Sequence, residues 1–526
     1  MNLDFLAGQM IMMGFEGFEF NSDIMDVLKR IKPCGVVLFK RNMRNWNQVN
    51  KLIRKLQNYA LEIGLPMFLI ALDHEGGPVF RMSNRLTPLP SAMALGASNN
   101  LNLVECIARI AGEELRALGF NLNFAPVADL NTNPRNPIIG IRSFGDDPIK
   151  VASMVSKYVL TLQSLGVMAT AKHFPGHGDT SVDSHLDLPL VDIDFNTLMN
   201  RELIPFKAAI EVGVSCIMTS HVCFPKIDSS NLPATFSSYF LRDILRGLLG
   251  FNGVIVSDAL EMKAISSRFD VDEIACYGLK AGLDIFLRCS DIDYIFELKD
   301  AIIKCIKNGV VTPSEIHNSY TRINALREKI KSLIKPSEIS ISTFRKNRMM
   351  SRDISLSSIT IINSSLFNSL KNLESIAILV PRRLERFLSN FDPDVVRMIV
   401  DEFGVYWGNM VVSFYDESSS IEDLIDIVLN VDGTIFFTYN AIFDNFQLNL
   451  YKEIKDKVVV VVAAGLPYDA EFINDKPILL TYGFNPLILS ALVDVLYGVC
   501  EARGILPVKL NLKTSICDNS LSHKHI

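Results

Sequence analysis

Runs of apolar residues alternate with helical patterns along the first part of the chain. Strand-like apolar runs lie at residues 35–39, 67–72, 121–127, 167–171, 214–221, 253–258 and 282–287. Between them, apolar residues recur with helical spacing at residues 46–63, 101–118, 198–212 and 241–249. Continuous apolar strands that alternate with helices are typical of a parallel sheet covered by helices. At this length the pattern favours a (β/α)8 TIM-like barrel.

A polar stretch at residues 336–357 then interrupts the alternation, which resumes beyond it. The later apolar runs lie at residues 376–380, 410–414, 434–438, 458–463 and 478–482. We therefore predict a barrel domain at residues 1–335, a linker at 336–357 and a smaller α/β/α sandwich domain at 358–526. The second domain has no histidine before His523 and no acids clustered at its strand ends. We expect it to supply no catalytic group.

Composition narrows the class of protein. The 526 residues are 49% hydrophobic, which supports a sizeable core, and the formal net charge of −6 argues against a nucleic-acid partner. No apolar run approaches the roughly 18 residues that span a membrane, and the first residues lack the basic start of a signal peptide. Nine cysteines without a C-x-x-C spacing fit reduced thiols, so we expect a cytoplasmic protein with no membrane partner.

Charged residues follow several of the predicted strands directly. Asp73, Lys172 with His173, and Asp258 all stand where an apolar run ends. Active sites of (β/α)8 barrels collect at the carboxyl ends of the strands, so these residues are expected to share one site. Arg81 lies in the loop beyond Asp73 and could reach the same mouth. Arg142, in a loop rich in Asn, Pro and Gly, suits either a solvated charge or a contact to a polar ligand.

The loop at residues 172–189 brings three histidines and three aspartates together in one span. In Asp183-Ser-His185 the carboxylate can accept the imidazole Nδ1 proton, which leaves the other nitrogen to exchange a proton with substrate. In an isolated D-x-H, the histidine is more often a loop residue whose hydrogen bonds are made within the protein. The other histidines and aspartates of this loop favour the catalytic interpretation. A metal site of His173, His177 and His185 is the alternative. Pro175 and Gly176 exclude helical spacing, so we expect neither a metal nor a cofactor.

This loop resembles the K-H-F-P-G-H-G-x-x-x-x-D-x-H loop of family 3 glycoside hydrolases, in the bacterial β-N-acetylglucosaminidase branch. It matches at every fixed position. The resemblance extends over residues 1–335 and is strong also at 72–81, 123–129, 139–144 and 256–262. Two positions depart from the pattern: His74 stands where the family has Gln, and Pro78 where it has Arg. Both lie beside the sugar-binding positions, so we expect them to alter the entrance for the leaving group.

The resemblance implies a role for each candidate residue. Asp258 is expected to be the nucleophile, kept ionised by Lys172 and Arg142, and His185, oriented by Asp183, the general acid/base. The residues expected to bind sugar hydroxyls are Asp73, Arg81, Arg142, Lys172 and His173. An imidazole pKa near about 6.5 suits proton transfer in both directions. The implied activity is retaining hydrolysis of terminal β-linked GlcNAc in muropeptides or chitooligosaccharides.

Three other functions stay open at this point. A neutral histidine does not repel phosphate as a carboxylate would, so a β-N-acetylglucosaminide phosphorylase of the same family is one alternative. The histidines leave a metal-dependent hydrolase as a second. A non-catalytic sugar-binding protein is the third, and it is disfavoured because binding alone does not require a nucleophile opposite a proton donor.

Overall fold

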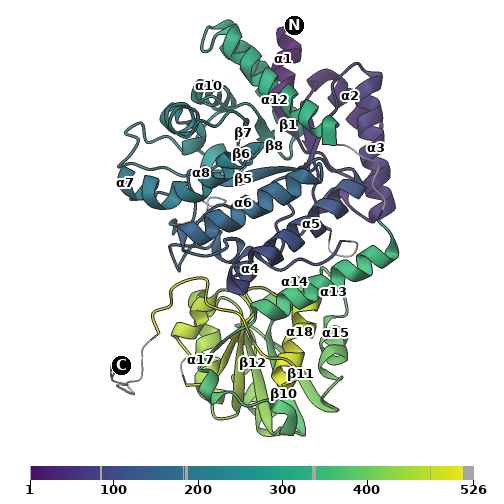
Figure 1. The fold of residues 1–526 in the computed structure, drawn as a ribbon, viewed down its shortest axis with the longest axis vertical. Helices are drawn as coiled ribbons and strands as arrows, with labels where there is room; N and C mark the ends of the chain where they lie inside the picture. Colours follow the sequence, from purple (N-terminus) through teal and green to yellow (C-terminus); the bar gives the residue numbers. More distant parts are fainter. Residues whose placement is uncertain are drawn as a thin grey trace, which may run out of the picture.

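The computed structural model describes residues 2–82, 86–181, 183, 187–333, 339–473 and 475–512, which form two α/β domains (Figure 1). The first is a barrel of parallel strands in the order β7-β6-β5-β4-β3-β2-β1-β8, closed by a parallel bridge between Val256 and Ile285. Its strands are β1 (Ile11–Met13), β2 (Gly35–Val37), β3 (Leu69–Leu72), β4 (Leu122–Asn123), β5 (Met168–Phe174), β6 (Cys216–Thr219), β7 (Val254–Val256) and β8 (Phe286–Arg288). The predicted TIM-like barrel is confirmed.

Helices surround the barrel, and most of them bury an apolar face against it. They are α1 (Leu3–Gln9), α2 (Ser22–Ile31), α3 (Trp46–Glu62), α4 (Ala92–Ser98), α5 (Leu101–Leu118), α6 (Pro148–Ser164), α7 (Phe195–Thr197), α8 (Leu203–Glu211), α9 (Lys263–Ser266), α10 (Val271–Ala281), α11 (Ile292–Lys307) and α12 (Pro313–Leu333). Two π-helices, η3 (Leu198–Glu202) and η5 (Tyr239–Leu248), occupy parts of the expected helices. In α10, Asp270 and Glu273 form a capping box, and Gly282 ends the helix with φ of 97°.

Strand β1 was not expected from the sequence, which places the first strand at residues 35–39. Its three residues follow α1 almost directly, and all three are fully buried. They pair with β2 on one side and β8 on the other. So short an apolar run beside an apolar helix has no period of its own, and only closure of the barrel makes it a strand.

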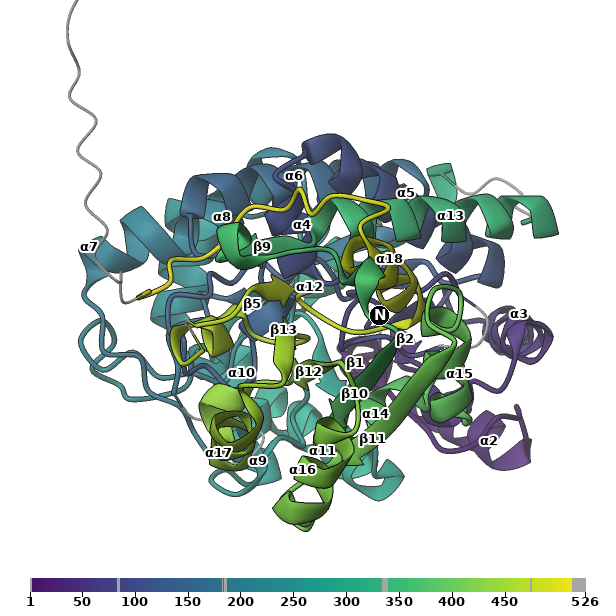
Figure 2. The ribbon, with the colours of Figure 1, turned by 90° about the horizontal axis from the view of Figure 1, so that it is seen from below.

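The second domain is a three-layer α/β/α sandwich on a six-stranded sheet with the order β11-β10-β12-β13-β14-β9. Its strands are β9 (Thr360–Ile362), β10 (Ser375–Pro381), β11 (Asn409–Tyr415), β12 (Gly433–Thr438), β13 (Val458–Ala463) and β14 (Ile478–Leu480), with only β9 antiparallel. One face carries α14 (Arg382–Leu388), α15 (Val395–Phe403) and α18 (Pro486–Tyr497), and the other α16 (Ile421–Leu429) and α17 (Asn445–Ile454) (Figure 2).

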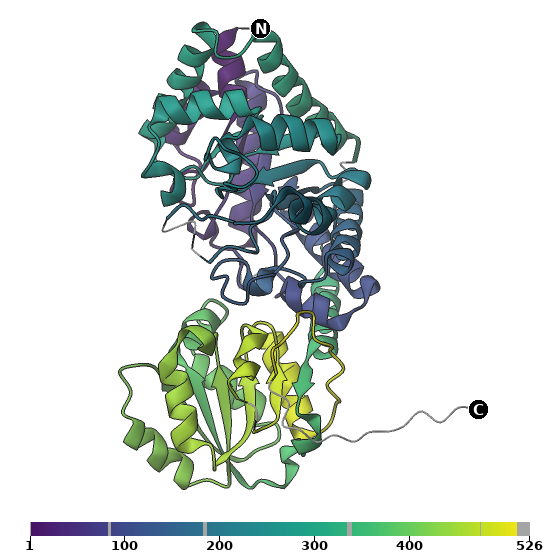
Figure 3. The ribbon, with the colours of Figure 1, turned by 90° about the vertical axis from the view of Figure 1, so that its left-hand side faces the viewer.

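The two domains lie one beyond the other along the molecule's long axis (Figure 3). A helix, α13 (Ile341–Ser358), occupies most of the expected linker and packs on α4, α5 and α18. The expected boundary at residue 335 lies outside the described residues. Hydrogen bonds join the domains around the carboxyl end of the barrel: Asn131 donates to the Tyr468 hydroxyl at 2.8 Å, and the Lys509 N–H donates to Asp146 at 2.8 Å. The second domain therefore abuts the end of the barrel where the predicted site lies.

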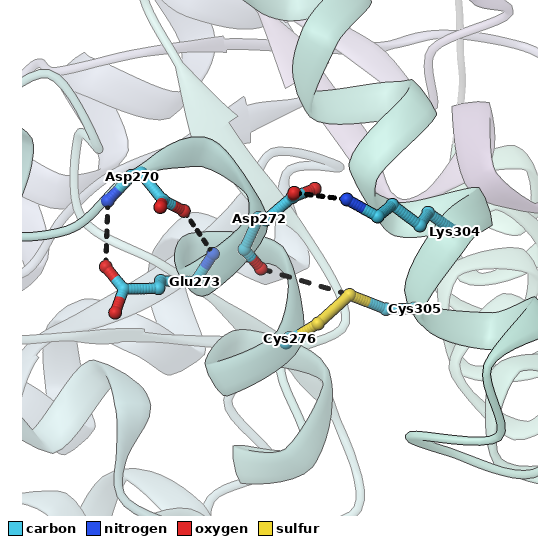
Figure 4. The surroundings of a disulfide bond; sticks show 6 residues. All are labelled: Asp270, Asp272, Glu273, Cys276, Lys304 and Cys305. Carbon is cyan, nitrogen blue, oxygen red and sulfur yellow. Dashed lines mark hydrogen bonds and ion pairs between the residues drawn. A yellow bond between two sulfur atoms is a disulfide. The ribbon is translucent and has the colours of Figure 1, made fainter.

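One pair of cysteines contradicts the expectation of reduced thiols. Cys276 on α10 and Cys305 on α11 form a disulfide, with Cα atoms 5.7 Å apart (Figure 4). The pairing is invisible in the sequence because 29 positions separate the two residues, and only the packing of α10 on α11 brings them together. Among the described helices, none has the length and apolarity to cross a membrane.

Candidate active site

A cavity of about 360 Å³ opens at the carboxyl end of the barrel strands. Residues beyond or within β2, β3, β4, β5, β6, β7 and β8 line it: Phe39, Arg41, Asp73, Glu75, Val79, Arg81, Phe124, Ile138, Arg142, Lys172, His173, His177, Met218, Asp258, Ala259, Glu261, Met262, Leu287 and Cys289. It thus contains all five predicted hydroxyl-binding residues and the predicted nucleophile. The position and size suit one small polar ligand.

A second buried charged group in the cavity, beside Lys172, is Glu75. Its carboxylate accepts hydrogen bonds from Arg142 Nε at 2.8 Å and Arg142 Nη2 at 2.9 Å, and Lys172 Nζ lies 2.5 Å away. Burial acts to raise the pKa of Glu75, but the two cations outweigh it and hold the pKa well below its usual range. Glu75 is therefore ionised and holds two cationic side chains in place, Arg142 from the loop after β4 and Lys172 from β5. Sequence reasoning gave it no role, although it stands in a matching segment, because its pairing with Arg142 depends on the fold.

Lys172 joins Glu75 to the next carboxylate, Asp73. Its Nζ lies 2.8 Å from Asp73 Oδ1, and Arg81 Nη2 approaches Asp73 Oδ2 at 3.4 Å. Burial acts to lower the pKa of Lys172, but the two carboxylates outweigh it and raise the pKa. The result is a row of alternating charges, Arg142, Glu75, Lys172, Asp73 and Arg81, which offers both donors and acceptors to a polyhydroxylated ligand.

His173 is oriented from behind by Asp129. Its Nδ1 lies 2.7 Å from Asp129 Oδ2, and the same carboxylate accepts the backbone N–H groups of His173 and His177. Asp129 is fully buried; burial acts to raise its pKa, but the adjacent His173 outweighs this and lowers it. A proton on Nδ1 leaves His173 Nε2, 3.5 Å from Arg142 Nη2, as an acceptor beside the cavity. In the sequence, Asp129 stood only at the end of the matching segment 123–129, with no role of its own.

The predicted nucleophile, Asp258, lies two residues beyond the end of β7. Its Oδ1 accepts the Ala259 N–H at 2.7 Å. Burial acts to raise the pKa of Asp258, but His173, His221, the Ala259 N–H and Lys172 together lower it below its ordinary value. The carboxylate is therefore ionised at neutral pH, as a nucleophile requires. Lys172 and Arg142 were both expected to keep Asp258 ionised. Lys172 lowers the pKa of Asp258 as expected, whereas the guanidinium of Arg142 pairs with Glu75.

The predicted acid/base pair is described only in part. His185 lies outside the described residues, as do its neighbours on either side, whereas Asp183 is described. Both ends of this loop are tied to other elements by ion pairs: Asp179 bonds Arg201 on η3 at 2.6 Å, and Asp187 bonds Arg268 beyond α9 at 2.6 Å. The geometry of the Asp183–His185 pair stays a prediction.

Of the three histidines of the metal alternative, the two that the structure describes, His173 and His177, are engaged with protein groups. His173 bonds Asp129, and His177 Nδ1 lies 3.0 Å from the Thr180 hydroxyl. Burial lowers the pKa of His177 to about 4, so it is neutral. Across the described part of the chain, no group of three or more His, Cys, Asp or Glu residues is arranged to hold a metal ion.

The two departures from the family pattern lie beside the cavity. His74 is 1% exposed, and its backbone exchanges two hydrogen bonds with the Asn123 side chain. Its ring packs on Phe80 with centroids 5.0 Å apart, and burial lowers its pKa to about 4. Neither ring nitrogen has a hydrogen-bond partner. His74 therefore acts as a neutral packing residue beneath the segment that carries Pro78 and Arg81.

Comparison with known proteins places this geometry in a family. The chain is similar to Beta-hexosaminidase A of Pseudoalteromonas piscicida, 28% identical over 557 residues, covering 93% of this chain and 91% of that protein. It is 38% identical over 298 residues to a Beta-hexosaminidase of Thioalkalivibrio sulfidiphilus, covering 56% of this chain and 84% of the relative. A solved family 3 beta-N-acetylglucosaminidase from Paenibacillus sp. str. FPU-7 superposes with a TM-score of 0.90 at 32% identity, over 98% of this chain and 100% of that one.

The family model for the glycosyl hydrolase family 3 N terminal domain matches residues 2–326, which include all eight barrel strands and end within α12. This chain therefore belongs to glycosyl hydrolase family 3.

Proposed function

We propose that the protein is a retaining exo-β-N-acetylglucosaminidase, which removes terminal β-linked GlcNAc from a saccharide. The observation that carries the proposal is an ionised Asp258 in the same small cavity as the Arg142–Glu75–Lys172–Asp73–Arg81 row. The β-hexosaminidases and the β-N-acetylglucosaminidase to which the chain is similar support the choice of sugar.

The terminal sugar is held by its hydroxyl groups. Asp73 and Glu75 accept hydrogen bonds, Lys172 and Arg142 donate them, and His173 Nε2 accepts one. These groups are already paired with one another, so hydroxyls insert into an existing network and meet fixed partners. Such preorganisation lowers the cost of orienting the substrate.

In the first step, an Asp258 oxygen forms a bond to the anomeric carbon while the bond from that carbon to the leaving oxygen breaks. His185 supplies the proton that the leaving oxygen takes. In the second step, water loses a proton to His185 and attacks the same carbon, which releases Asp258. The D-x-H spacing supports the pair, because Asp183 can orient the imidazole and stabilise its charged form.

For the source of the substrate we propose cell-wall muropeptides, with chitooligosaccharides as the alternative. The support is the resemblance of the loop at 172–189 to the branch of the family that acts on such sugars. A cytoplasmic location would fit recycling of muropeptides. The Cys276–Cys305 disulfide is instead typical of an oxidising compartment. If the protein is isolated without reductant and then alkylated, its mass shows whether these two thiols were oxidised, and this tests the location.

A direct assay tests the activity. Chromogenic β-GlcNAc and β-glucose substrates are compared at equal concentration, each with and without inorganic phosphate, and the released sugar is identified. The proposal expects free GlcNAc from the first substrate, retained β configuration in the initial product and no dependence on phosphate. Formation of GlcNAc 1-phosphate would identify a phosphorylase, and preference for the glucoside would contradict the proposed substrate.

A further inference from the structure

The second domain reaches the rim of the cavity through the segment between α14 and α15. There, Lys40 Nζ donates to Asn390 Oδ1 at 2.6 Å. The rings of Phe80 and Phe391 stack with centroids 5.8 Å apart and planes 29° apart. Asn390 and Phe391 belong to the second domain, and Lys40 and Phe80 to the loops after β2 and β3.

Both barrel partners are direct neighbours of residues that line the cavity. Lys40 precedes Arg41, and Phe80 lies between Val79 and Arg81. The second domain therefore packs on the rim without lining the described cavity itself.

The charge row shows which way the cavity opens. Side-chain exposure rises from 2% at Lys172 and 5% at Glu75 to 17% at Asp73 and 36% at Arg81. Arg81 is thus the outermost member of the row. In an exo-acting enzyme the terminal sugar fills the closed end, so the leaving group lies toward Arg81 and the rings beside it.

The aromatic rings at this rim pack one on another in a row. Phe80 packs on the buried His74 at 5.0 Å, Phe391 stacks on Phe80, and Phe387 packs on Phe391 at 6.2 Å. Phe80, Phe387 and Phe391 are each only half-buried. Because His74 stands where the family has Gln, an aromatic base supports the row in this chain. Flat apolar faces beside polar groups are suited to the C–H face of a sugar ring.

We infer that Phe80 and Phe391 form the wall on which a saccharide leaving group packs, so that the second domain sets leaving-group selectivity without supplying a catalytic group. The inference rests on the proposed function. The leaving group it specifies is a pyranose of a β-linked disaccharide or longer saccharide.

The experiment compares a substrate with a saccharide leaving group, N,N′-diacetylchitobiose, with GlcNAc β-fluoride, whose leaving group is a single atom. For Phe391→Ala, the ratio of kcat/KM on chitobiose to kcat/KM on the fluoride should fall about tenfold, through a higher KM, because a lost aromatic contact is worth about one factor of ten. Phe391→Tyr should restore the ratio. The matched control is Phe443→Ala, which removes an exposed ring on η8 (Ala441–Phe443) and should leave the ratio at the wild-type value.

Equal losses on both substrates would overturn the inference, since Phe391 would then only support the loop that carries Arg81. An unchanged ratio with an unchanged Tm would overturn it as well. These outcomes differ from failure of the proposed function, in which the wild-type enzyme hydrolyses neither GlcNAc substrate and both proposals fall together.

Discussion

Arg142 and Glu75 meet in a two-pronged ion pair, with Nε and Nη2 donating to the two carboxylate oxygens at 2.8 and 2.9 Å. The pair joins the loop after β3 to the loop after β4 within the cavity. Both side chains are largely buried, at 15% exposed for Arg142 and 5% for Glu75. Removing one partner of a buried pair leaves the other charge uncompensated, which costs about 3–5 kcal/mol.

Glu75→Gln should therefore lower both stability and activity. The amide keeps the shape but loses the charge, so Lys172 and Arg142 retain only Asp73 as a nearby acidic partner in the row. We expect a clear fall in Tm and a loss of about 10²-fold in kcat/KM, the size typical of misplaced substrate contacts. Glu105→Gln, at partly exposed ion pairs with Arg109 and Lys157, is the control and should change neither quantity much. Wild-type activity in Glu75→Gln would show that the row does not hold the substrate.

Asp258 should be the residue that carries the glycosyl group. Its ionised carboxylate lies beside the cavity, and removal of a nucleophile typically costs on the order of 10⁴-fold or more in kcat. Asp258→Asn should show a loss of that size with a near wild-type Tm. A fluorinated mechanism-based inhibitor should add its mass to Asp258 itself, located by fragmenting the labelled peptide. Label on any other residue would contradict the assignment, with Glu261, which lies on the same peptide and also lines the cavity, as the nearest competitor.

The sequence was sufficient for the residues that stand at strand ends. Asp73, Lys172, His173 and Asp258 share one cavity because the carboxyl ends of parallel barrel strands converge. Arg81 and Arg142 were candidates from their positions in loops after strands, and the family resemblance gave them their expected role. The partners that hold these residues were not predicted. Glu75 pairs with Arg142, which is 67 positions away in the sequence, and Asp129 pairs with His173, which is 44 positions away. Such pairs are set by which strands become neighbours, which no local pattern encodes.

The elements missed from the sequence have the same cause. Strands β1 and β9 follow helices α1 and α13 almost directly, so neither stands out as a separate apolar run, and each becomes a strand only through its neighbours in the sheet. The Cys276–Cys305 link likewise depends on α10 lying beside α11. Local propensity was thus sufficient for the fold class, whereas tertiary packing determined these two strands and the disulfide.

His185 should act as the proton donor to the leaving group. His185→Ala should cost about 10² to 10⁴-fold with a saccharide leaving group, the usual contribution of general acid catalysis. With an activated aryl leaving group, which needs little protonation, the first step should suffer far less. The second step then limits turnover, so rapid mixing should reveal a burst of released phenol.

Asp183→Asn is the companion variant. It should cost less than His185→Ala, because the imidazole remains but loses the carboxylate that orients it and favours its charged form. Equal losses for good and poor leaving groups in the first step of His185→Ala would exclude His185 as the proton donor. Recovery of that variant by added zinc would favour the metal-dependent alternative instead.

Glu202 should make the protein less stable as pH rises. The side chain is 2% exposed and packs against Gly176 in the loop at 172–189, and burial raises its pKa from 4.5 to about 7 despite the adjacent Arg201. Between these pH values the folded protein holds a proton that the unfolded chain has lost. Stability from this group is therefore fully present below about pH 4.5 and lost as pH rises to about 7, by about 3 kcal/mol in total.

Glu202→Gln carries a neutral side chain of the same shape at every pH, so it should escape this loss. The Tm of the variant relative to the wild type should rise from pH 5 to pH 8, as measured by thermal unfolding in matched ionic strength. Glu211→Gln, at the exposed end of α8, is the control and should keep a constant difference from the wild type. Parallel Tm curves for Glu202→Gln and the wild type would show that Glu202 is ionised in the folded protein across this range, held by Arg201 at 2.6 Å.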